Sequence, residues 1–273
     1  NFVDIDTETL GVCPKKLEKY LRKIIIKKKN KSFNKHTKKH IKAIIIVHVY
    51  GFSCKVNAIK KICKKYNIEL IEDAAEAVGS FYKKKHLGTF GNFGILSFNG
   101  NKIITSGGGG AVLTNNNKIA KKINILINNS RKHHKWKYDY WGVGYNYKMT
   151  NLNASLGYSQ LNKINQILLK KKKIHNLYQK IFKSNLDLKL IKAPKKSKSN
   201  YWLNTLYIKK IDASNRDFII KTLNKKGIQV RAVWKLLHKI KAFSKFPKSD
   251  LKNSEYLFKK VISIPSGPNL LSK

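Results

Sequence analysis

The sequence predicts an α/β protein with a parallel sheet, followed by a small α+β unit. Two observations carry this prediction. In the first half of the chain, short β-branched apolar runs alternate with amphipathic stretches at helical spacing. After a long helical stretch that starts near Asn151, the order changes to strand, helix, strand. The 273 residues, 42% of them hydrophobic, are enough for one large or two modest units with buried cores.

The first predicted elements are a helix over residues 13–30, a strand over 42–49, a helix over 57–67 and a strand over 68–73. A proline near the start of the first helix suits its first turn. The run KAIIIVHV at 42–49 is apolar and β-branched, which predicts a strand buried on both faces. Strand, helix and strand at this short spacing predict a parallel βαβ unit.

Two more strands are predicted over residues 93–99 and 109–115, on either side of a loop that carries Lys102, which we call the lysine loop. A helix over 116–129 follows. Another helix is predicted from Asn151 past Tyr178, because apolar residues recur there every three or four positions.

The four lysines at 170–173 are interpreted as a solvated turn of this long helix. The domain boundary is placed inside the helix, with residues 1–165 forming the large unit and residues 166–273 the small one. The small unit is expected to contain a strand over 200–209, a helix over 215–227 and a strand over 228–234. Gly227 fits the C-cap of that helix.

The formal net charge of +44 suggests a protein that binds nucleic acid or another polyanion. The excess is nearly all lysine, however, and the lysines are spread along the chain. Arginine, whose planar fork suits phosphate and base recognition, occurs at four positions: Arg22, Arg131, Arg216 and Arg231. We therefore expect no specific nucleic-acid partner, while an anionic small substrate remains compatible with the charge.

Cys13, Cys54 and Cys63 have no CxxC spacing and no paired histidines, and His133 and His134 are adjacent in a polar stretch. We expect no metal site and reduced thiols. No apolar run approaches the length of a membrane-spanning helix, and no signal peptide is visible. The expectation is a cytoplasmic protein that does not bind a membrane.

Lys102 lies between a predicted strand and four consecutive glycines at 107–110. A lysine amine can bond to a carbonyl carbon, and pyridoxal phosphate is the commonest cofactor that uses this reaction. Asp73, at the end of a predicted strand, is either a helix N-cap or the acidic partner that keeps the cofactor's ring nitrogen protonated. The glycines would permit close backbone approach or positive φ. On these residues alone, a glycine-rich hairpin with an ordinary surface lysine is an equally good interpretation.

Several stretches, in order and over almost the whole chain, resemble the DegT/DnrJ/StrS family of pyridoxal-phosphate-dependent sugar aminotransferases. They are HVYGFSCKVNAI, IELIEDAAEAVGS with SFNGNKIITSGGGGAVLTNN, VGYNYKMTNLNASLGYSQL, NYWLN and VWKLLHKIKAF. The resemblance implies a fold-type I transferase, with a mixed, mostly parallel sheet and helices on both faces. The most similar subgroup uses glutamate to aminate the 4-keto group of nucleotide-linked 4-keto-6-deoxy-N-acetylhexosamines, on routes to bacillosamine-like and legionaminic-acid-like sugars.

The same resemblance implies roles for the matched residues. Lys102 would form the Schiff base and carry protons, and Asp73 would pair with the pyridine nitrogen. Glu76 stands where the family usually has a polar residue that contacts the ring hydroxyl. Ser97 would bind the cofactor phosphate, with an ordinary strand serine as the alternative.

Two further roles concern the substrate side and the partner subunit. Asn146 would reach the phosphate from the second subunit of a homodimer, and a turn residue is the alternative. His238 would line the sugar pocket, and a satisfied surface histidine is the alternative. His48 also falls in a family motif, but we interpret it as a structural group that anchors the end of its strand.

Two departures from the family pattern affect the expectation. Lys148 stands where the family commonly has arginine, which loses a bidentate fork. Family members also continue before the position matched by Asn1, with a phosphate-binding turn and a stacking aromatic that we cannot recognise here. We therefore expect an N-terminally truncated chain with an incomplete site. An inactive remnant of the family stays a second hypothesis, and a polyanion-binding protein a third.

Overall fold

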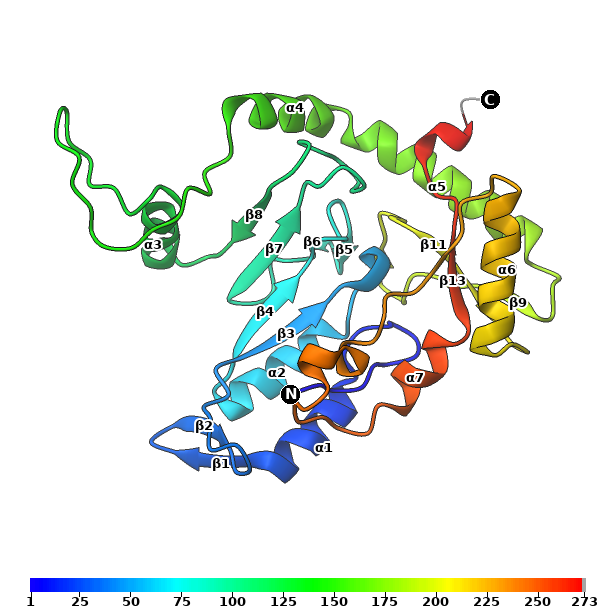
Figure 1. Cartoon of the computed structure of the whole chain (residues 1–273), viewed down its shortest axis with the longest axis horizontal. Helices are drawn as coiled ribbons and strands as arrows, with labels where there is room; N and C mark the ends of the chain where they lie inside the picture. The colour runs from blue at the N-terminus through cyan, green and yellow to red at the C-terminus, as the bar shows by residue number, and fades with distance from the viewer. Residues whose placement is uncertain (272–273) are drawn as a thin grey trace.

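The computed structural model describes residues 1–271. The first half of the chain builds a four-stranded sheet in the order β3-β4-β7-β8 (Figure 1). The strands β3 (Ala43–Val47), β4 (Glu69–Asp73) and β7 (Phe93–Ser97) are parallel, and β8 (Gly110–Leu113) runs antiparallel to β7. The predicted βαβ unit is confirmed, and so is the pairing of the two strands on either side of the lysine loop.

Side chains along β3 alternate between the two faces of this sheet. On one face, Ile46 and Leu70 are buried against α1 (Pro14–Ile24) and α2 (Val56–Tyr66). On the other face, Ile45 is 61% exposed. The prediction that this strand is buried on both faces is therefore wrong for this chain. Its β-branched residues favour the extended backbone, but only every second one reaches the helices.

The first helix ends earlier than predicted. After Ile24 the chain forms a hairpin of β1 (Ile25–Lys28) and β2 (Lys31–Asn34). Lys29 and Asn30 both have positive φ, 44° and 59°, as the favoured two-residue hairpin turns require. Three consecutive β-branched isoleucines at the end of the helix favour the change to strand.

The second half of the chain builds another four-stranded sheet, in which every neighbouring pair is antiparallel. Its strands, in spatial order, are β12 (Arg231–Ala232), β13 (Val261–Ile264), β11 (Asn204–Ile208) and β9 (Leu188–Leu190). The predicted helix is α6 (Ala213–Lys225), and Gly227 after it has a φ of 78°, which confirms the C-cap. The strand predicted over 228–234 shortens to the two residues of β12, and β9 and β13 were not predicted.

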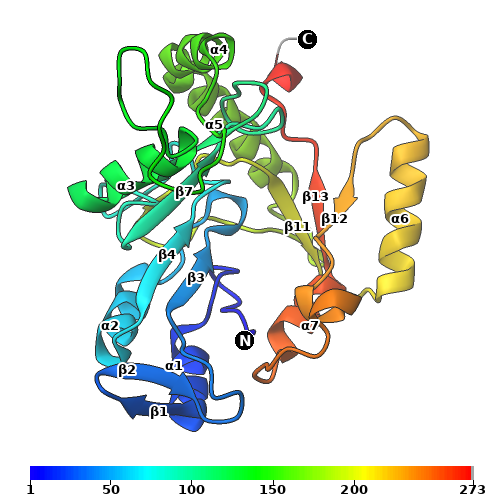
Figure 2. The same cartoon turned by 60° about the vertical axis from the view of Figure 1, so that its left-hand side comes forward.

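Helix α3 (Asn117–Ile127) agrees with the prediction. The long helix does not, because it divides into α4 (Asn151–Asn162) and α5 (Ile164–Ile181) at Lys163. Residues 128–150, which we call the arm, join α3 to α4 and project away from the sheet (Figures 1 and 2).

The interpretation of residues 170–173 as a solvated turn is wrong for one of the four lysines. Lys171 is 5% exposed, whereas Lys170, Lys172 and Lys173 are exposed. Its position explains this, because Lys171 lies three and four residues before the buried Ile174 and His175, on the same helical face.

Short elements complete the fold. They are β5 (Phe81–Tyr82), β6 (Lys85–His86) and β10 (Ser197–Lys198), which form a three-stranded sheet, the helix α7 (Lys252–Phe258), and 3₁₀ turns at Val49–Gly51, Leu237–Lys239, Lys241–Phe243 and Pro268–Leu271. Among residues 1–271, no helix is both long and apolar enough to cross a membrane.

One apolar cluster joins the two halves of the chain. It contains Tyr50, Phe52 and Ile103 from the first half and Trp202 and Val261 from the second. The two four-stranded sheets lie on either side of residue 165 in the sequence, but the division into units 1–165 and 166–273 stays a prediction. The shared cluster places the second half of the chain against the loop that carries Lys102.

Candidate active site

Lys102 lies in the loop between β7 and β8, and the glycines that follow it are needed for the backbone path. Gly107 and Gly109 have φ values of 80° and 81°. At Gly110, a Cβ atom would lie 2.3 Å from the carbonyl oxygen of Leu96. A residue with a side chain would strain these positions, which confirms the expected positive φ and close backbone approach.

Asp73 is the last residue of β4, and no helix begins after it. Its Oδ1 accepts a hydrogen bond from the backbone N–H of Ala75 at 3.1 Å, which closes a turn. The N-cap interpretation is therefore wrong. Glu76, three residues on, accepts a hydrogen bond at Oε2 from the backbone N–H of Tyr50 at 2.6 Å.

Lys102 and the two carboxyl groups influence one another electrostatically. Burial lowers the pKa of Lys102, and the charges of Glu76 and Asp73 oppose this change. Burial raises the pKa of Glu76 to about 7, against the opposing effects of the Tyr50 N–H and the Lys102 charge. The site therefore contains a carboxyl group and an amine whose pKa values are both shifted toward neutral pH, where each can exchange a proton more readily.

The residues present fit pyridoxal phosphate at the ring end. Among residues 1–271, Lys102 Nζ forms no ion pair with Asp73 or Glu76, although it feels the charge of both. Instead it lies over the ring of Trp202, 4.1 Å from the centroid. Asp73 ends β4, and the loop after the neighbouring parallel strand β7 carries Lys102, so the carboxylate and the amine belong to the same edge of the sheet. Pyridoxal phosphate needs a lysine at its carbonyl carbon and an acid at its ring nitrogen.

Lys102 also lines a cavity of about 990 Å³ between the lysine loop and the second half of the chain. Two indole rings in its wall stack on each other, those of Trp202 and Trp234, with centroids 6.0 Å apart and planes 9° apart. Tyr50 extends the stack beyond Trp234 at 5.6 Å. Apolar ring faces beside a few charged groups are typical of a site for a small molecule.

Residues 1–273 match the model of the DegT/DnrJ/EryC1/StrS aminotransferase family over the whole chain. The chain belongs to this family. EpsN of Bacillus subtilis (strain 168), assigned as a pyridoxal phosphate-dependent aminotransferase, is 34% identical over 273 residues, which are 98% of this chain and 67% of EpsN. GDP-perosamine synthase of Escherichia coli O157:H7 is 34% identical over 275 residues, 98% of this chain and 68% of the synthase.

Solved structures agree with this assignment. PseC of Helicobacter pylori, an aminotransferase involved in the biosynthesis of pseudoaminic acid, has a TM-score of 0.87 and 26% identity, over 99% of this chain and 69% of PseC. An aminotransferase of the family from Brucella abortus has a TM-score of 0.86 over 98% of this chain and 68% of its own, and at 24% identity it shows the fold alone. The chain thus spans about two thirds of the length of these relatives. The fold-type I prediction is confirmed, and the family depends on pyridoxal phosphate.

The other expected residues of the family site lie in different settings. Ser97 ends β7 and is half-buried, and its Oγ accepts a hydrogen bond from the Asn99 N–H at 3.3 Å. Asn146 is exposed on the arm. His238 is 7% exposed, and its Nε2 lies 3.0 Å from Glu255 Oε1. Lys102 lies near enough to Asp73 and Glu76 for their charges to act on its pKa, but the lining of the Lys102 cavity includes neither carboxyl group, nor Asn146, nor His238.

The sequence analysis missed four residues of the cavity wall: Lys171, Trp202, Arg231 and Trp234. Two of them, Trp202 and Trp234, stand in stretches that resemble the family, NYWLN and VWKLLH. For Lys171, the helical spacing to Ile174 and His175 was the available signal.

His48 is the expected structural anchor. Its Nδ1 accepts a hydrogen bond from the Cys54 N–H at 3.2 Å, so Nε2 carries the proton that it shares with Glu72 at 2.9 Å. Both side chains are fully buried. Glu72 also accepts hydrogen bonds from the backbone N–H groups of Gly88, Phe90 and Gly91. This pair ties β3 and β4 to the loop before β7, one residue away from Asp73.

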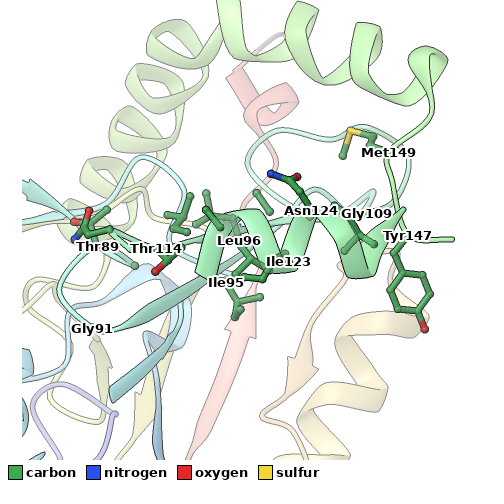
Figure 3. Close-up of a pocket in the computed structure, with 18 residues that line it drawn as sticks. Thr89, Gly91, Ile95, Leu96, Gly109, Thr114, Ile123, Asn124, Tyr147 and Met149 are labelled. Carbon is green, nitrogen blue, oxygen red and sulfur yellow. The ribbon is translucent and has the colours of Figure 1, made fainter. Parts of the chain in front are cut away.

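A second cavity, of about 740 Å³, lies between the β7–β8 hairpin and α3 (Figure 3). Ile95, Leu96 and Ile123 line it, together with Tyr147 and Met149 at the end of the arm. None of its described lining residues is charged. It therefore lacks cationic side chains such as Lys102, Lys171 and Arg231, which line the first cavity. Among residues 1–271, no cluster of three or more His, Cys, Asp or Glu side chains could hold a metal ion.

Proposed function

We propose that this protein is a pyridoxal-phosphate-dependent aminotransferase. It would transfer an amino group from glutamate to the 4-keto group of a nucleotide-linked 4-keto-6-deoxyhexosamine, with an N-acetyl group on the sugar. The observation that carries the proposal is the placement of Asp73 at the end of β4 and of Lys102 in the loop after the neighbouring parallel strand β7, in a chain of this family. The names of two relatives, GDP-perosamine synthase and an enzyme of pseudoaminic acid biosynthesis, support an amino-sugar product.

Pyridoxal phosphate, when bound, supplies an electron sink for the negative charge that develops beside its carbonyl carbon. The carboxylate of Asp73 would hold the proton on the ring nitrogen, which keeps the sink effective. Lys102 would bind the cofactor through Nζ and, once released, move the proton between the two carbons that exchange it. Glu76 would orient the ring through its hydroxyl group, and Ser97 would bind the phosphate.

A homodimer with a shared site is part of the proposal. The arm exposes a series of large aromatic side chains, among them Trp136 at 72%, Trp141 at 69% and Tyr147 at 75%. Leu152 at the start of α4 is 86% exposed. Large exposed aromatic side chains gathered on one segment are typical of an interface, and a second copy of the chain is the occupant that we propose. Asn146 on the arm would then reach the partner's cofactor phosphate.

The function is tested by capture of the cofactor. Purified protein is mixed with pyridoxal phosphate, reduced with borohydride and digested, and the labelled peptide is identified by mass spectrometry. We expect a visible absorbance band before reduction and the label on Lys102. Lys102→Ala should abolish the label and transamination, and Asp73→Ala should weaken cofactor retention. The control is Lys172→Ala on the exposed surface of α5, because Lys171, which we first interpreted as solvated, is buried. A label on another lysine, or none, would refute the proposal and favour an inactive remnant.

Sharing of the site is tested by mixing two variants. Lys102→Ala and Asn146→Ala each remove one contribution to every site of a homodimer. A mixture that exchanges subunits forms mixed dimers in which one site is intact, so activity should return to about a quarter of the wild-type value. Mixtures that stay inactive although the subunits exchange would show that Asn146 does not act across the interface.

A further inference from the structure

Trp202 contacts the lysine loop in two ways. Its indole N–H donates a hydrogen bond to the carbonyl oxygen of Asn101 at 2.7 Å, and its ring centroid lies 4.1 Å from Lys102 Nζ. The side chain is 4% exposed, so its orientation is fixed by packing. One tryptophan thus holds both the residue before Lys102 and the end of the Lys102 side chain.

Trp202 is itself held from three sides. Its backbone N–H donates to Asn200 Oδ1 at 2.9 Å, its carbonyl oxygen accepts a hydrogen bond from Lys171 Nζ at 2.9 Å, and its ring stacks on Trp234. Asn200 in turn donates to the carbonyl oxygen of Glu76 at 2.8 Å. The segment from Asn200 to Trp202 therefore connects the lysine loop to the loop that carries Glu76.

The Lys102 amine lies over an aromatic ring although two carboxyl groups attract it. Asp73 at the end of β4 and Glu76 in the next loop both attract it, while Lys171 of α5 and Arg231 of β12 line the same cavity. Two carboxylates that attract an ammonium group compete to pair with it. Here, among residues 1–271, the amine makes no such pair and lies on an indole face.

We propose that Trp202 is a positioning residue for Lys102, whose indole face holds the amine away from Asp73 and Glu76 whenever the amine is not bonded to the cofactor. The purpose of this arrangement rests on the proposed function. An amine paired with a carboxylate must break that pair before it can lose its proton and attack a carbonyl carbon. A cation–π contact of about 0.5–2 kcal/mol is weak enough to be given up at that step.

The experiment uses cofactor-free protein, so it does not depend on catalysis. Trace acylation with isotopically labelled acetic anhydride over a range of pH gives the reactivity of each lysine by mass spectrometry. In Trp202→Leu the amine is free to move to the carboxylates. Its apparent pKa should rise by about one unit, which lowers its rate of acylation near pH 8 about tenfold. Trp202→Phe keeps an aromatic face and should stay close to the wild-type protein. Phe218→Leu on the exposed surface of α6 is the control and should leave Lys102 unchanged.

A double variant identifies the competing groups. Glu76→Gln in the Trp202→Leu background removes one of the two carboxylates and should restore part of the lost reactivity. The proposal is overturned if Trp202→Leu leaves Lys102 as reactive as in the wild-type protein, if Trp202→Phe is as slow as Trp202→Leu, or if the double variant recovers nothing.

A measurement on the unaltered protein covers the case in which Trp202→Leu does not fold. The NMR signals of the methylene group next to the Lys102 amine should be shifted upfield by the ring current of the indole, and Lys102→Met identifies them by their loss. Signals at ordinary positions would overturn the proposal. If Lys102 behaves as expected in these experiments but borohydride fixes no cofactor to it, the proposed function fails while the positioning role of Trp202 stands.

Discussion

Glu76 gives the sharpest quantitative test of the site. Burial raises its pKa from the ordinary 4.5 to about 7. In the unfolded chain the carboxyl group loses its proton near pH 4.5, and in the folded chain near pH 7. Between these values the folded state binds more protons than the unfolded state, so the contribution of Glu76 to stability falls as pH rises. A shift of this size corresponds to a cost of about 3 kcal/mol once the group is fully charged.

Glu76→Gln removes this cost, because glutamine stays neutral and its oxygen can still accept the hydrogen bond from Tyr50. Relative to the wild-type protein, the variant should gain about 3 kcal/mol in free energy of unfolding between about pH 4 and about pH 8. Urea denaturation followed by circular dichroism at intervals across this range measures the difference. Glu18→Gln is the control of opposite sign, since hydrogen bonds from Lys65 and Arg22 lower the pKa of Glu18. A difference for Glu76→Gln that does not change with pH would refute the reasoning.

Three further substitutions test the framework around the site. Glu72→Gln should lower the free energy of unfolding by about 3 kcal/mol in urea denaturation, because three backbone N–H groups lose a charged acceptor. Asn200→Ala should lower Tm by several degrees in calorimetry, because the hydrogen bonds to the carbonyl oxygens of Glu76 and Val78 are lost. Gly94→Ala should prevent folding, seen as rapid proteolysis, because a Cβ atom there would lie 1.8 Å from the carbonyl oxygen of Gly88. Wild-type stability in any of the three would contradict the corresponding contact.

The parallel part of the fold was predictable because its signals are local. The β-branched run at β3, the amphipathic helix α2 and the short spacing to β4 each specify one element, and their order specifies the βαβ unit. The hairpin of β1 and β2 also had a local signal, since three isoleucines precede a Lys-Asn turn. The predicted helix nevertheless extended through these residues, because its apolar spacing continues into them.

The centre of the site was predictable for a different reason. Parallel strands place their carboxyl ends at one edge of the sheet, so Asp73 at the end of β4 and Lys102 after β7 fall at the same edge once the topology is known. No comparable rule of topology predicts the stack of Tyr50, Trp234 and Trp202. Its members come from three segments far apart in the chain, and only the packing of the second half on the first brings them together.

Lys171 shows how a sequence signal can be present and still be overlooked, and it supplies a last test. A run of four lysines suggests solvent, but a helix turns about 100° per residue, so four consecutive positions cannot all face the same way. Lys171 faces inward and donates hydrogen bonds to the carbonyl oxygens of Trp202 at 2.9 Å and Ser266 at 2.7 Å.

Burial lowers the pKa of Lys171 to about 8. Between about pH 8 and about pH 10.5 the unfolded chain binds more protons than the folded chain, so the contribution of Lys171 to stability rises with pH. Lys171→Met leaves two carbonyl oxygens without their donor but also removes a buried charge, so its net cost should be small at neutral pH and rise to about 2–3 kcal/mol near pH 10.5. Lys172→Met, on the exposed side of the same turn, should change the free energy of unfolding by less than about 0.5 kcal/mol. Equal effects of the two substitutions in urea denaturation near pH 10.5 would show that the buried amine does not hold the Trp202 and Ser266 segments against α5.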